Sequence, residues 1–195
     1  MTMPAQEAAP TAAERRAARR ANQTTFNLVI ALIASLGLVL LIVVVVVRPD
    51  VQQPAVDYRL NAEGAQPRFA EPLVVPDLPD TWTANRATGT SASADGVARW
   101  DIGFMTPEGD YLELTQGIDA NPTWLADQVK GASAGPGLSI GGLRWTVYDR
   151  RDAADVGNVA YALVAESGAS TIVLSGTASD AEFEELALAV AEERE

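Results

Sequence analysis

The hydrophobic run at residues 28–47 restricts the possible structures of this chain more than any other feature. It contains no charged residue, and only Ser35 and Gly37 interrupt its apolar side chains. As a helix that rises about 1.5 Å per residue, the run would be about 30 Å long, the thickness of a bilayer's hydrocarbon core. The hydrophobic part of a secretory signal is shorter, about 7–15 residues, and small residues follow it at a cleavage site. Because this run ends in the bulky Val43–Val47, the sequence predicts an uncleaved transmembrane helix over residues 26–47.

The arginines around this run predict its orientation. Four arginines lie within residues 15–20, before the run, whereas only Arg48 follows it closely. Positive charge next to a transmembrane helix marks the cytoplasmic side. We therefore expect a basic cytoplasmic tail at residues 1–25, a single pass through the plasma membrane, and an extracytoplasmic C-terminal part.

The composition of the C-terminal part excludes several classes of function. Two of the 26 acidic residues and four of the 14 basic residues precede the run, which leaves 24 acidic against 10 basic residues after it, a net charge of −14. Nucleic-acid binding needs a basic surface, so we expect no nucleic-acid partner. The chain has no cysteine and no histidine, and it therefore lacks disulfides, thiol chemistry, and the usual metal ligand and general base. The sequence predicts no cofactor, no metal site and no catalytic residue.

Prolines divide the C-terminal part into a linker and a domain. Six prolines fall within residues 49–80, a density that disfavours regular structure. We expect a Pro-rich linker at residues 48–75. The remaining residues, 76–195, make a domain of about 120 residues, a normal size for one hydrophobic core.

Alternating apolar residues predict strands in this domain. Every second residue from Ala98 to Phe104 is apolar, so Trp100 is expected to face the core and Asp101 to face solvent. A turn at residues 107–109 joins this strand to a second one at Tyr111–Gln116, which completes a hairpin. Further strands are expected around Leu143–Val147, Val159–Leu163 and Thr171–Ser175.

Two helices carry N-terminal capping signals. Asn121 precedes a proline at the start of one helix, and Ser179 with Glu182 forms a capping box at the start of the last helix. The Gly- and Ser-rich residues 131–142 lack a phosphate-loop pattern and precede a strand, so they are interpreted as a flexible linker.

The two halves of the domain match each other weakly. A shift of 59 residues places Gly109 on Gly168 and Trp124 on Phe183. Each half thus reads as strand, hairpin and helix. The predicted fold class is α+β: one N-terminal transmembrane helix, then an extracytoplasmic domain with a mainly antiparallel sheet of about six strands and two helices, arranged as tandem β-β-β-α units.

Four short motifs connect this chain to a known family. They read Leu78-Pro79-x-x-Trp82, Trp100-x-x-Gly-Phe-x-Thr-Pro-x-Gly-x-Tyr111, Gly142-x-x-Trp145 and Ser175-Gly-Thr-Ala178. With them, the chain resembles a family of single-pass membrane proteins from actinobacteria, known as domain of unknown function 4245. The resemblance runs from the anchor to the C-terminus and implies no activity. The β-β-β-α layout is also similar to the Mog1/PsbP-like fold of some mycobacterial envelope lipoproteins.

Several residue groups allow both a functional and a structural interpretation. The turn from Thr106 to Gly109 suits a recognition loop or a plain hairpin turn. The four tryptophans suit a ligand groove or the core, and their phase in the strands favours the core. Asp149, Asp152 and Asp155 suit a calcium site or a solvated turn with local ion pairs, and the neighbouring arginines favour the turn.

The sequence favours a non-enzymatic binding or scaffolding role in the bacterial cell envelope, with another envelope protein, a lipid or a glycan as partner. The candidate interaction residues are Trp82, Thr106, Pro107, Glu108, Gly109 and Tyr111. The alternative is an envelope hydrolase that uses carboxylates, because a chain without histidine and cysteine would need an acid pair. Its nearest candidates are Asp101, Glu108, Asp110 and Glu113, which are expected to be solvated charges on strands and a turn.

Overall fold

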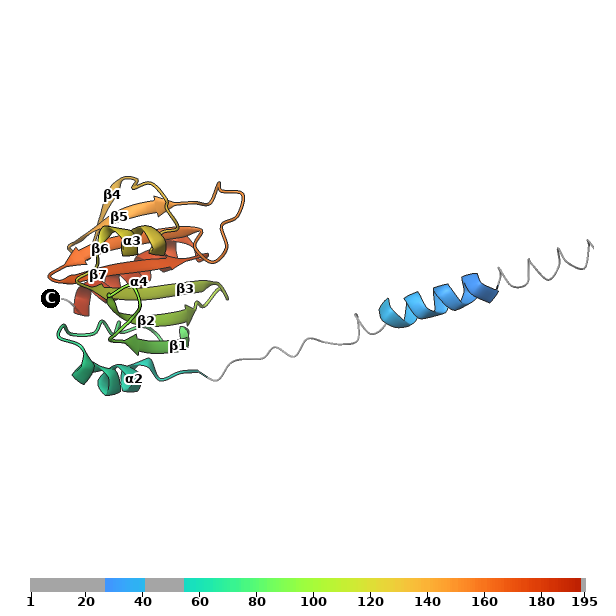
Figure 1. Cartoon of the computed structure of the whole chain (residues 1–195), viewed down its shortest axis with the longest axis horizontal. Helices are drawn as coiled ribbons and strands as arrows, with labels where there is room; N and C mark the ends of the chain where they lie inside the picture. Colours follow the sequence, from blue (N-terminus) through green and yellow to red (C-terminus); the bar gives the residue numbers. More distant parts are fainter. Residues whose placement is uncertain (1–26, 41–54, 194–195) are drawn as a thin grey trace, which may run out of the picture. The chain divides into compact units, whose positions relative to one another are not determined.

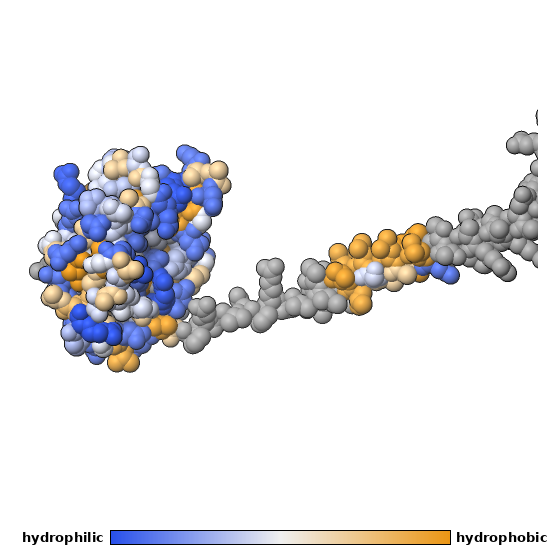
Figure 2. Space-filling model, in the orientation of Figure 1, coloured by the Kyte–Doolittle hydropathy of each residue, from blue (hydrophilic) through white to orange (hydrophobic). Residues whose placement is uncertain are grey.

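The computed structural model describes residues 27–40 and 55–193. Residues 27–40 are helical, and their surface is mainly hydrophobic (Figure 2). Within the two described ranges, no helix is both long and apolar enough to cross a membrane. The predicted tail at residues 1–25 and the valine end of the predicted anchor lie outside the described residues.

The C-terminal unit holds one seven-stranded sheet in the order β1-β2-β3-β7-β6-β5-β4, and all neighbouring strands are antiparallel (Figure 1). The strands are β1 (Thr83–Thr90), β2 (Ala98–Met105), β3 (Tyr111–Ile118), β4 (Gly137–Ile140), β5 (Leu143–Asp149), β6 (Tyr161–Ser167) and β7 (Ser170–Gly176). The helices are α2 (Tyr58–Ala65), the 3-10 turn η1 (Gln66–Arg68), α3 (Pro122–Gln128) and α4 (Asp180–Glu193). The α+β class and the antiparallel sheet are confirmed, but the sheet has seven strands instead of about six.

The two faces of the sheet carry separate hydrophobic clusters. Trp100 and its alternate neighbours in β2 pack in the larger cluster with side chains of α2 and α4. On the opposite face, Trp124 of α3 packs with Val164 and Val173. Helix α3 therefore covers one face and α4 the other, and the predicted inward phase of Trp100 is confirmed: this residue is fully buried.

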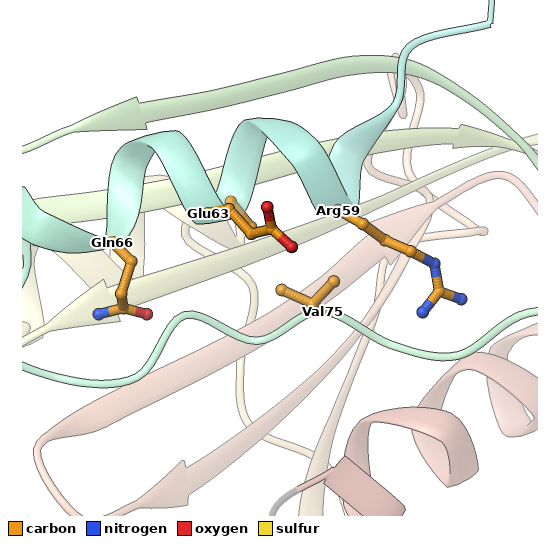
Figure 3. Close-up of a pocket in the computed structure, with 5 residues that line it drawn as sticks. Arg59, Glu63, Gln66 and Val75 are labelled. Atoms are coloured by element: carbon orange, nitrogen blue, oxygen red, sulfur yellow. The ribbon is translucent and has the colours of Figure 1, made fainter.

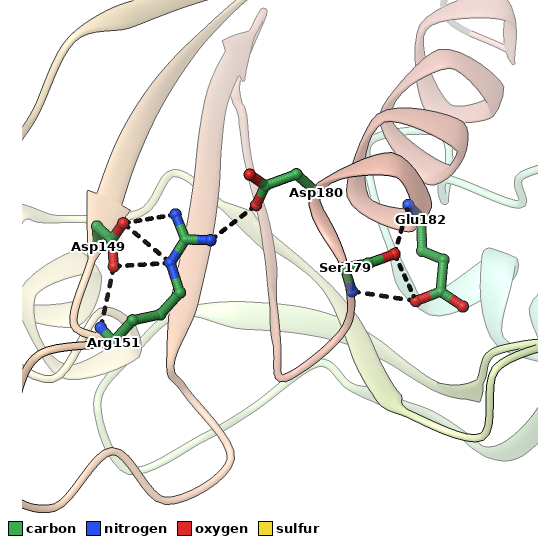
Figure 4. Close-up of polar contacts among 5 residues, drawn as sticks. All are labelled: Asp149, Arg151, Ser179, Asp180 and Glu182. Atoms are coloured by element: carbon green, nitrogen blue, oxygen red, sulfur yellow. Dashed lines mark hydrogen bonds and ion pairs between the residues drawn. The ribbon is translucent and has the colours of Figure 1, made fainter.

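Both predicted helix caps are present. The Asn121 side-chain oxygen accepts a hydrogen bond from the Trp124 N–H at 2.9 Å. At the start of α4, the Ser179 N–H donates to Glu182 Oε2 at 3.0 Å, and the Glu182 N–H donates to Ser179 Oγ at 3.4 Å (Figure 4). This reciprocal pair is the capping box that the sequence predicts.

The predicted linker at residues 48–75 differs from the structure in its second half. Residues 58–68 form α2 and η1, and the segment from Phe69 to Val74 contributes buried side chains to the larger core cluster. The side chains of the sheet supply this segment with hydrogen bonds: Trp100 Nε1 donates to the Val74 carbonyl at 3.0 Å. The prolines prevent long regular elements here, but the apolar residues between them are still buried on the sheet.

The Gly- and Ser-rich residues 131–142 are also more ordered than the sequence predicts. Gly137–Ile140 form β4, which pairs with β5 from Gly137↔Thr146 to Ile140↔Leu143. The second half of the domain therefore reads β-β-β-β-α, so the predicted tandem of two β-β-β-α units is wrong in its strand number.

The 59-residue match between the halves does not describe a structural repeat. It equates Leu114 with Val173, but Leu114 packs in the larger core cluster and Val173 in the cluster under α3. A shift by one residue turns every side chain of a strand to the other face. The matched glycines and aromatics thus occur in equivalent elements without equivalent orientation.

Candidate functional site

A cluster of polar side chains occupies the α3 side of the sheet over the first three strands. Its members, which we call the polar face, are Arg86 of β1, Arg99 and Asp101 of β2, and Tyr111, Glu113 and Thr115 of β3. Strand alternation brings them together, since Arg86 pairs with Gly103, Gly103 with Glu113, and Asp101 with Thr115. An irregularity between Ala84 and Arg86 shifts the register of β1, so that Arg86 lies opposite Gly103.

Glu113 is the centre of one half of the polar face. It forms an ion pair with Arg86, and the Tyr111 hydroxyl donates to its Oε2 atom at 3.3 Å. Gly103 makes room for these groups, because a Cβ atom there would lie 2.6 Å from Asn85 Oδ1 and 3.0 Å from the Tyr111 hydroxyl. Any larger residue at position 103 would displace Tyr111 or Asn85.

Asp101 is the centre of the other half. Only 7% of the residue is exposed, Thr115 Oγ1 donates to its Oδ1 atom at 3.0 Å, and Arg99 Nε lies 3.3 Å from its Oδ2 atom. The expectation of a solvated carboxylate is therefore wrong for Asp101. Its side chain does point away from Trp100, as predicted, but neighbouring polar side chains cover its carboxylate and leave little of it in contact with water.

Burial controls the protonation of these groups. It raises the pKa of Asp101, and the hydrogen bond from Thr115 and the charge of Arg99 oppose this effect. Burial also raises the pKa of Glu113, which Arg86 opposes and the charge of Asp101 reinforces. For Tyr111, burial together with the charge of Glu113 raises the pKa to about 12. The pKa values of both carboxyl groups, Asp101 and Glu113, are thus raised.

These shifts predict how stability depends on pH. A carboxyl group whose folded-state pKa is raised destabilises the fold above that pKa, and the cost disappears as the pH falls towards the ordinary value of 3.8 for Asp101. Asp101→Asn keeps an acceptor for Thr115 and removes the charge. We expect the parent chain to gain stability relative to Asp101→Asn between pH 7 and pH 4, measured as the difference between their urea unfolding free energies. A flat difference would show that the Arg99 ion pair cancels the cost of burial.

The sequence did not single out Arg86, Arg99 or Thr115. Arg99 and Asp101 do share the outward phase of one strand, which is a usable signal. The position of Arg86 depends on the irregularity in β1, and the position of Thr115 depends on the register between β2 and β3. Neither can be read from a single strand.

The predicted recognition turn docks on the start of α4. Thr106 is buried, and its Oγ1 atom accepts the Asp110 N–H at 3.0 Å. Glu182 Oε1 accepts the Glu108 N–H at 3.4 Å, so the carboxylate of the capping box also holds this turn. Gly109 has a φ of +88°, a conformation that favours glycine. Pro107, Glu108 and Gly109 remain exposed at the tip.

Three carboxylates meet at this turn and offer the arrangement closest to a metal site in the described residues. Oxygen atoms of Glu108, Asp110 and Glu182 lie within 4.8 Å of one another. Burial acts to raise the pKa of Glu182, but hydrogen bonds from Thr106, Ser179 and Glu108 outweigh it and lower the pKa. Since its oxygens already accept these bonds, the cluster is explained by the closure of the turn onto α4.

Trp82 and the other tryptophans belong to the core. Trp82 is buried, and its ring makes an edge contact with Phe104 at a centroid distance of 6.1 Å. Trp100, Trp124 and Trp145 are each 1% exposed or less. The core interpretation of the tryptophans is confirmed, and Trp82 offers little surface to a partner. Of the predicted interaction residues, only Tyr111 belongs to the polar face.

Of the three aspartates considered for calcium, Asp149 is held by an arginine instead. Arg151 donates to the Asp149 carboxylate from Nε at 3.0 Å and from Nη2 at 2.6 Å, and its Nη1 atom donates to Asp180 Oδ1 at 2.9 Å (Figure 4). The guanidinium also stacks on Tyr161, with 4.6 Å between its carbon and the ring centroid. The turn after β5 is therefore held by ion pairs, as the turn interpretation expects.

Two surface cavities lie away from the polar face. One, of about 410 Å³, lies between α2 and the chain at Val75, with Arg59, Glu63 and Gln66 beside it (Figure 3). Arg59 is paired with Asp77, and Gln66 bonds the backbone of Glu71 and Leu73. These contacts hold α2 against the following segment. The cavity therefore lies where two packed segments meet, and its polar side chains are already used to hold them together. The second, of about 290 Å³, lies between β4 and α4.

Comparison with known proteins identifies a family whose function is not known. The family model described as "Protein of unknown function (DUF4245)" matches residues 20–190. No curated protein and no solved structure matches the chain. The similarity to the Mog1/PsbP-like fold and the actinobacterial source therefore stay predictions.

Proposed function

We propose that this chain, which belongs to the DUF4245 family of proteins of unknown function, is a membrane-anchored, non-enzymatic binding protein of the bacterial cell envelope. Its contact surface is the polar face over β1, β2 and β3. The chemistry of that face suits a partner that offers hydrogen-bond acceptors, such as an anionic glycan, a lipid headgroup or an acidic protein surface.

The observation that carries this proposal is the layering of charge on the polar face. The side chains of Arg86 and Arg99 are 48% and 37% exposed, whereas their partners Glu113 and Asp101 are 23% and 10% exposed. The carboxylates thus lie closer to the sheet, and the guanidinium groups lie closer to solvent. Each guanidinium has five N–H donors in a fixed plane, more than one carboxylate contact uses. The exposed part of each guanidinium therefore leaves N–H groups available to an acceptor outside the domain, although the domain as a whole is acidic.

The same carboxylates also support the alternative, an envelope hydrolase. Asp101 and Glu113 interact, both are largely buried, and the pKa of each is raised. Acid–base catalysis by two carboxyl groups requires environments that separate their pKa values. Here each carboxylate has its own arginine and its own hydroxyl donor, and neither lines one of the two cavities described above. Binding is the better interpretation.

Membrane topology is the first test. We expect protease treatment of intact spheroplasts to digest a tag at the C-terminus and to spare a tag at the N-terminus, because the arginines precede the hydrophobic run. Lysed spheroplasts, in which both tags are digested, provide the control. Digestion of the N-terminal tag alone, or release of a soluble mature form, would contradict the proposed anchor.

Cross-linking in intact cells tests the contact surface. Thr88 is exposed and pairs with Asp101 across β1 and β2, so Thr88→Glu places a negative charge on the polar face. We expect this variant to lose the cross-linked partners that mass spectrometry finds for the parent chain. Thr123→Glu, at an exposed position in α3, is the matched control and should keep them.

Three outcomes would overturn the proposal. The first is an unchanged partner list for Thr88→Glu, and the second is the absence of any reproducible partner. The third is turnover of an envelope ester or glycoside by the purified chain that Asp101→Asn or Glu113→Gln abolishes, which would establish the hydrolase instead.

A further inference from the structure

The two edge strands of the sheet, β1 and β4, differ in how far other segments cover them. At the β1 edge, the Val56 N–H donates to the Ala84 carbonyl at 2.8 Å, and α2 packs beside the strand, so that edge is covered. At the other edge, β4 pairs with β5 on one side only. No described residue pairs with its outer side. Because strand backbone groups alternate in direction, every second N–H and C=O of β4 faces outward.

The residues of β4 do little to block this edge. Edge strands in natural proteins commonly carry charges or an internal proline, which prevent pairing with other chains. The four residues of β4 read GLSI, without a charge or a proline inside the strand. Leu138 is 41% exposed in spite of its apolar side chain. An apolar, unpaired edge of this kind is a template for an added strand.

A groove accompanies the open edge. The cavity of about 290 Å³ runs between β4 and the first turns of α4. Its apolar walls come from Leu138, Ile140, Leu163 and Phe183, with Tyr161 and Ser139 beside them. Leu138 and Ile140 lie two residues apart and therefore point to the same face, the face that α4 covers. A side chain from an added strand would enter this groove next to Leu138.

The charge at the groove determines what fits it. Asp180 and Glu184 are its charged lining residues, and both are exposed and acidic. Arg151 neutralises Asp180, but Glu184 has no ion pair among the described residues. A partner that carried a basic side chain between two apolar ones, all on one face of a strand, would match the groove in both shape and charge.

We propose that the β4–α4 groove binds an extended, basic and apolar segment of another protein, which adds to β4 as an eighth strand. This inference goes beyond the proposed function. The groove and the polar face lie on opposite faces and at opposite ends of the sheet, and their preferences are opposite, since the polar face presents cations and the groove presents carboxylates.

The test uses the full chain in detergent micelles and a synthetic peptide. The probe is an acetylated peptide of sequence TVTKTVT whose first valine is replaced by a photoreactive leucine, so that two apolar side chains and the lysine share one face. After irradiation, we expect mass spectrometry to find cross-links to residues 137–140 and to residues 180–188. The same peptide with glutamate in place of lysine should cross-link about tenfold less, because like charges would then meet.

Two variants of the chain distinguish binding at this groove from non-specific binding of the peptide. Leu138→Arg adds a positive charge and a larger side chain at an exposed position of the groove, and should lower the cross-link yield about tenfold or more. Leu60→Arg, at an exposed position of α2 near the opposite edge, should leave the yield unchanged. Both variants replace exposed leucines, so folding is preserved and circular dichroism verifies this.

Cross-links elsewhere on the chain, equal yields with the lysine and glutamate peptides, an unchanged yield in Leu138→Arg, or no cross-link at all would overturn the proposal. None of these outcomes bears on the polar face, which is tested through Thr88→Glu. A negative result for one proposed surface therefore does not decide whether the other surface binds a partner.

Discussion

Replacement of Trp100 by alanine should lower the free energy of unfolding of the C-terminal unit by about 3–5 kcal/mol, the usual range for an aromatic-to-alanine change in a core. Trp100 is fully buried in the larger hydrophobic cluster. Its indole N–H also donates to the Val74 carbonyl at 3.0 Å. The substitution therefore leaves a cavity and removes the partner of a buried carbonyl group, and both effects destabilise the fold.

Urea unfolding of residues 52–195, which form one unit, measures this change by tryptophan fluorescence and circular dichroism. Leu60→Ala is the control, because Leu60 is exposed on α2 and its truncation should cost under about 1 kcal/mol. A midpoint for Trp100→Ala equal to that of the control would be inconsistent with burial of Trp100 in the core.

The choice of residues 52–195 matters for this experiment. A fragment that began at residue 76 would lack α2 and the segment from Phe69 to Val74, both of which pack in the larger cluster. Its sheet would expose Trp100 and the surrounding apolar side chains of β2. The boundary suggested by the prolines would thus remove part of the core along with the linker.

The parts of the fold that the sequence predicts correctly are those determined by local patterns. The alternation from Ala98 to Phe104 and the capping signals at Asn121 and Ser179 each depend on a few neighbouring residues, and each has the predicted structure. Alternation and capping determine which face of a strand is apolar and where a helix begins.

The parts that the sequence misses have two different causes. Strand β4 has a loop-like composition but pairs with its neighbour β5 across the Gly141-Gly142 turn, so the loop interpretation overlooked a local hairpin. The segment after η1 is proline-rich and is ordered by side chains of β2 and β3. Composition describes what a segment does alone, and here tertiary contacts override it.

The candidate site shows the same division. Tyr111, Asp101 and Glu113 were all singled out from the sequence, but as an interaction residue and as separate solvated charges. To predict that they lie next to Arg86, the register of β1, β2 and β3 must be known. Conversely, the turn Thr106-Pro-x-Gly109 suits a recognition loop or a plain hairpin turn by sequence, and much of it is explained by its bonds to Glu182. Recognition of a motif did not reveal whether it binds a partner or closes the fold.

Replacement of Gln116 by methionine should cost about 3 kcal/mol or more, although the two side chains have similar size. Gln116 is fully buried in β3, next to Trp100. Its Oε1 atom accepts the Val74 N–H at 2.9 Å, and its Nε2 atom donates to the Pro72 carbonyl and to Ser170 Oγ, each at 2.9 Å. Methionine would remove the partner of the buried Val74 N–H and of the buried Ser170 hydroxyl, at about 1–3 kcal/mol for each, whereas water can reach the carbonyl of the exposed Pro72.

Gln66→Met is the matched control. Gln66 also holds this segment, through the Leu73 N–H at 2.9 Å and the Glu71 carbonyl at 3.0 Å, but it is only partly buried. Water can replace its hydrogen bonds, so we expect a loss of about 1 kcal/mol. Urea unfolding of both variants gives the comparison, and hydrogen exchange at the Val74 amide, which should accelerate only in Gln116→Met, locates the effect. Equal losses in the two variants would mean that burial of the amide does not determine the cost, and that the apolar contacts of Phe69 and Leu73 alone hold the segment on the sheet.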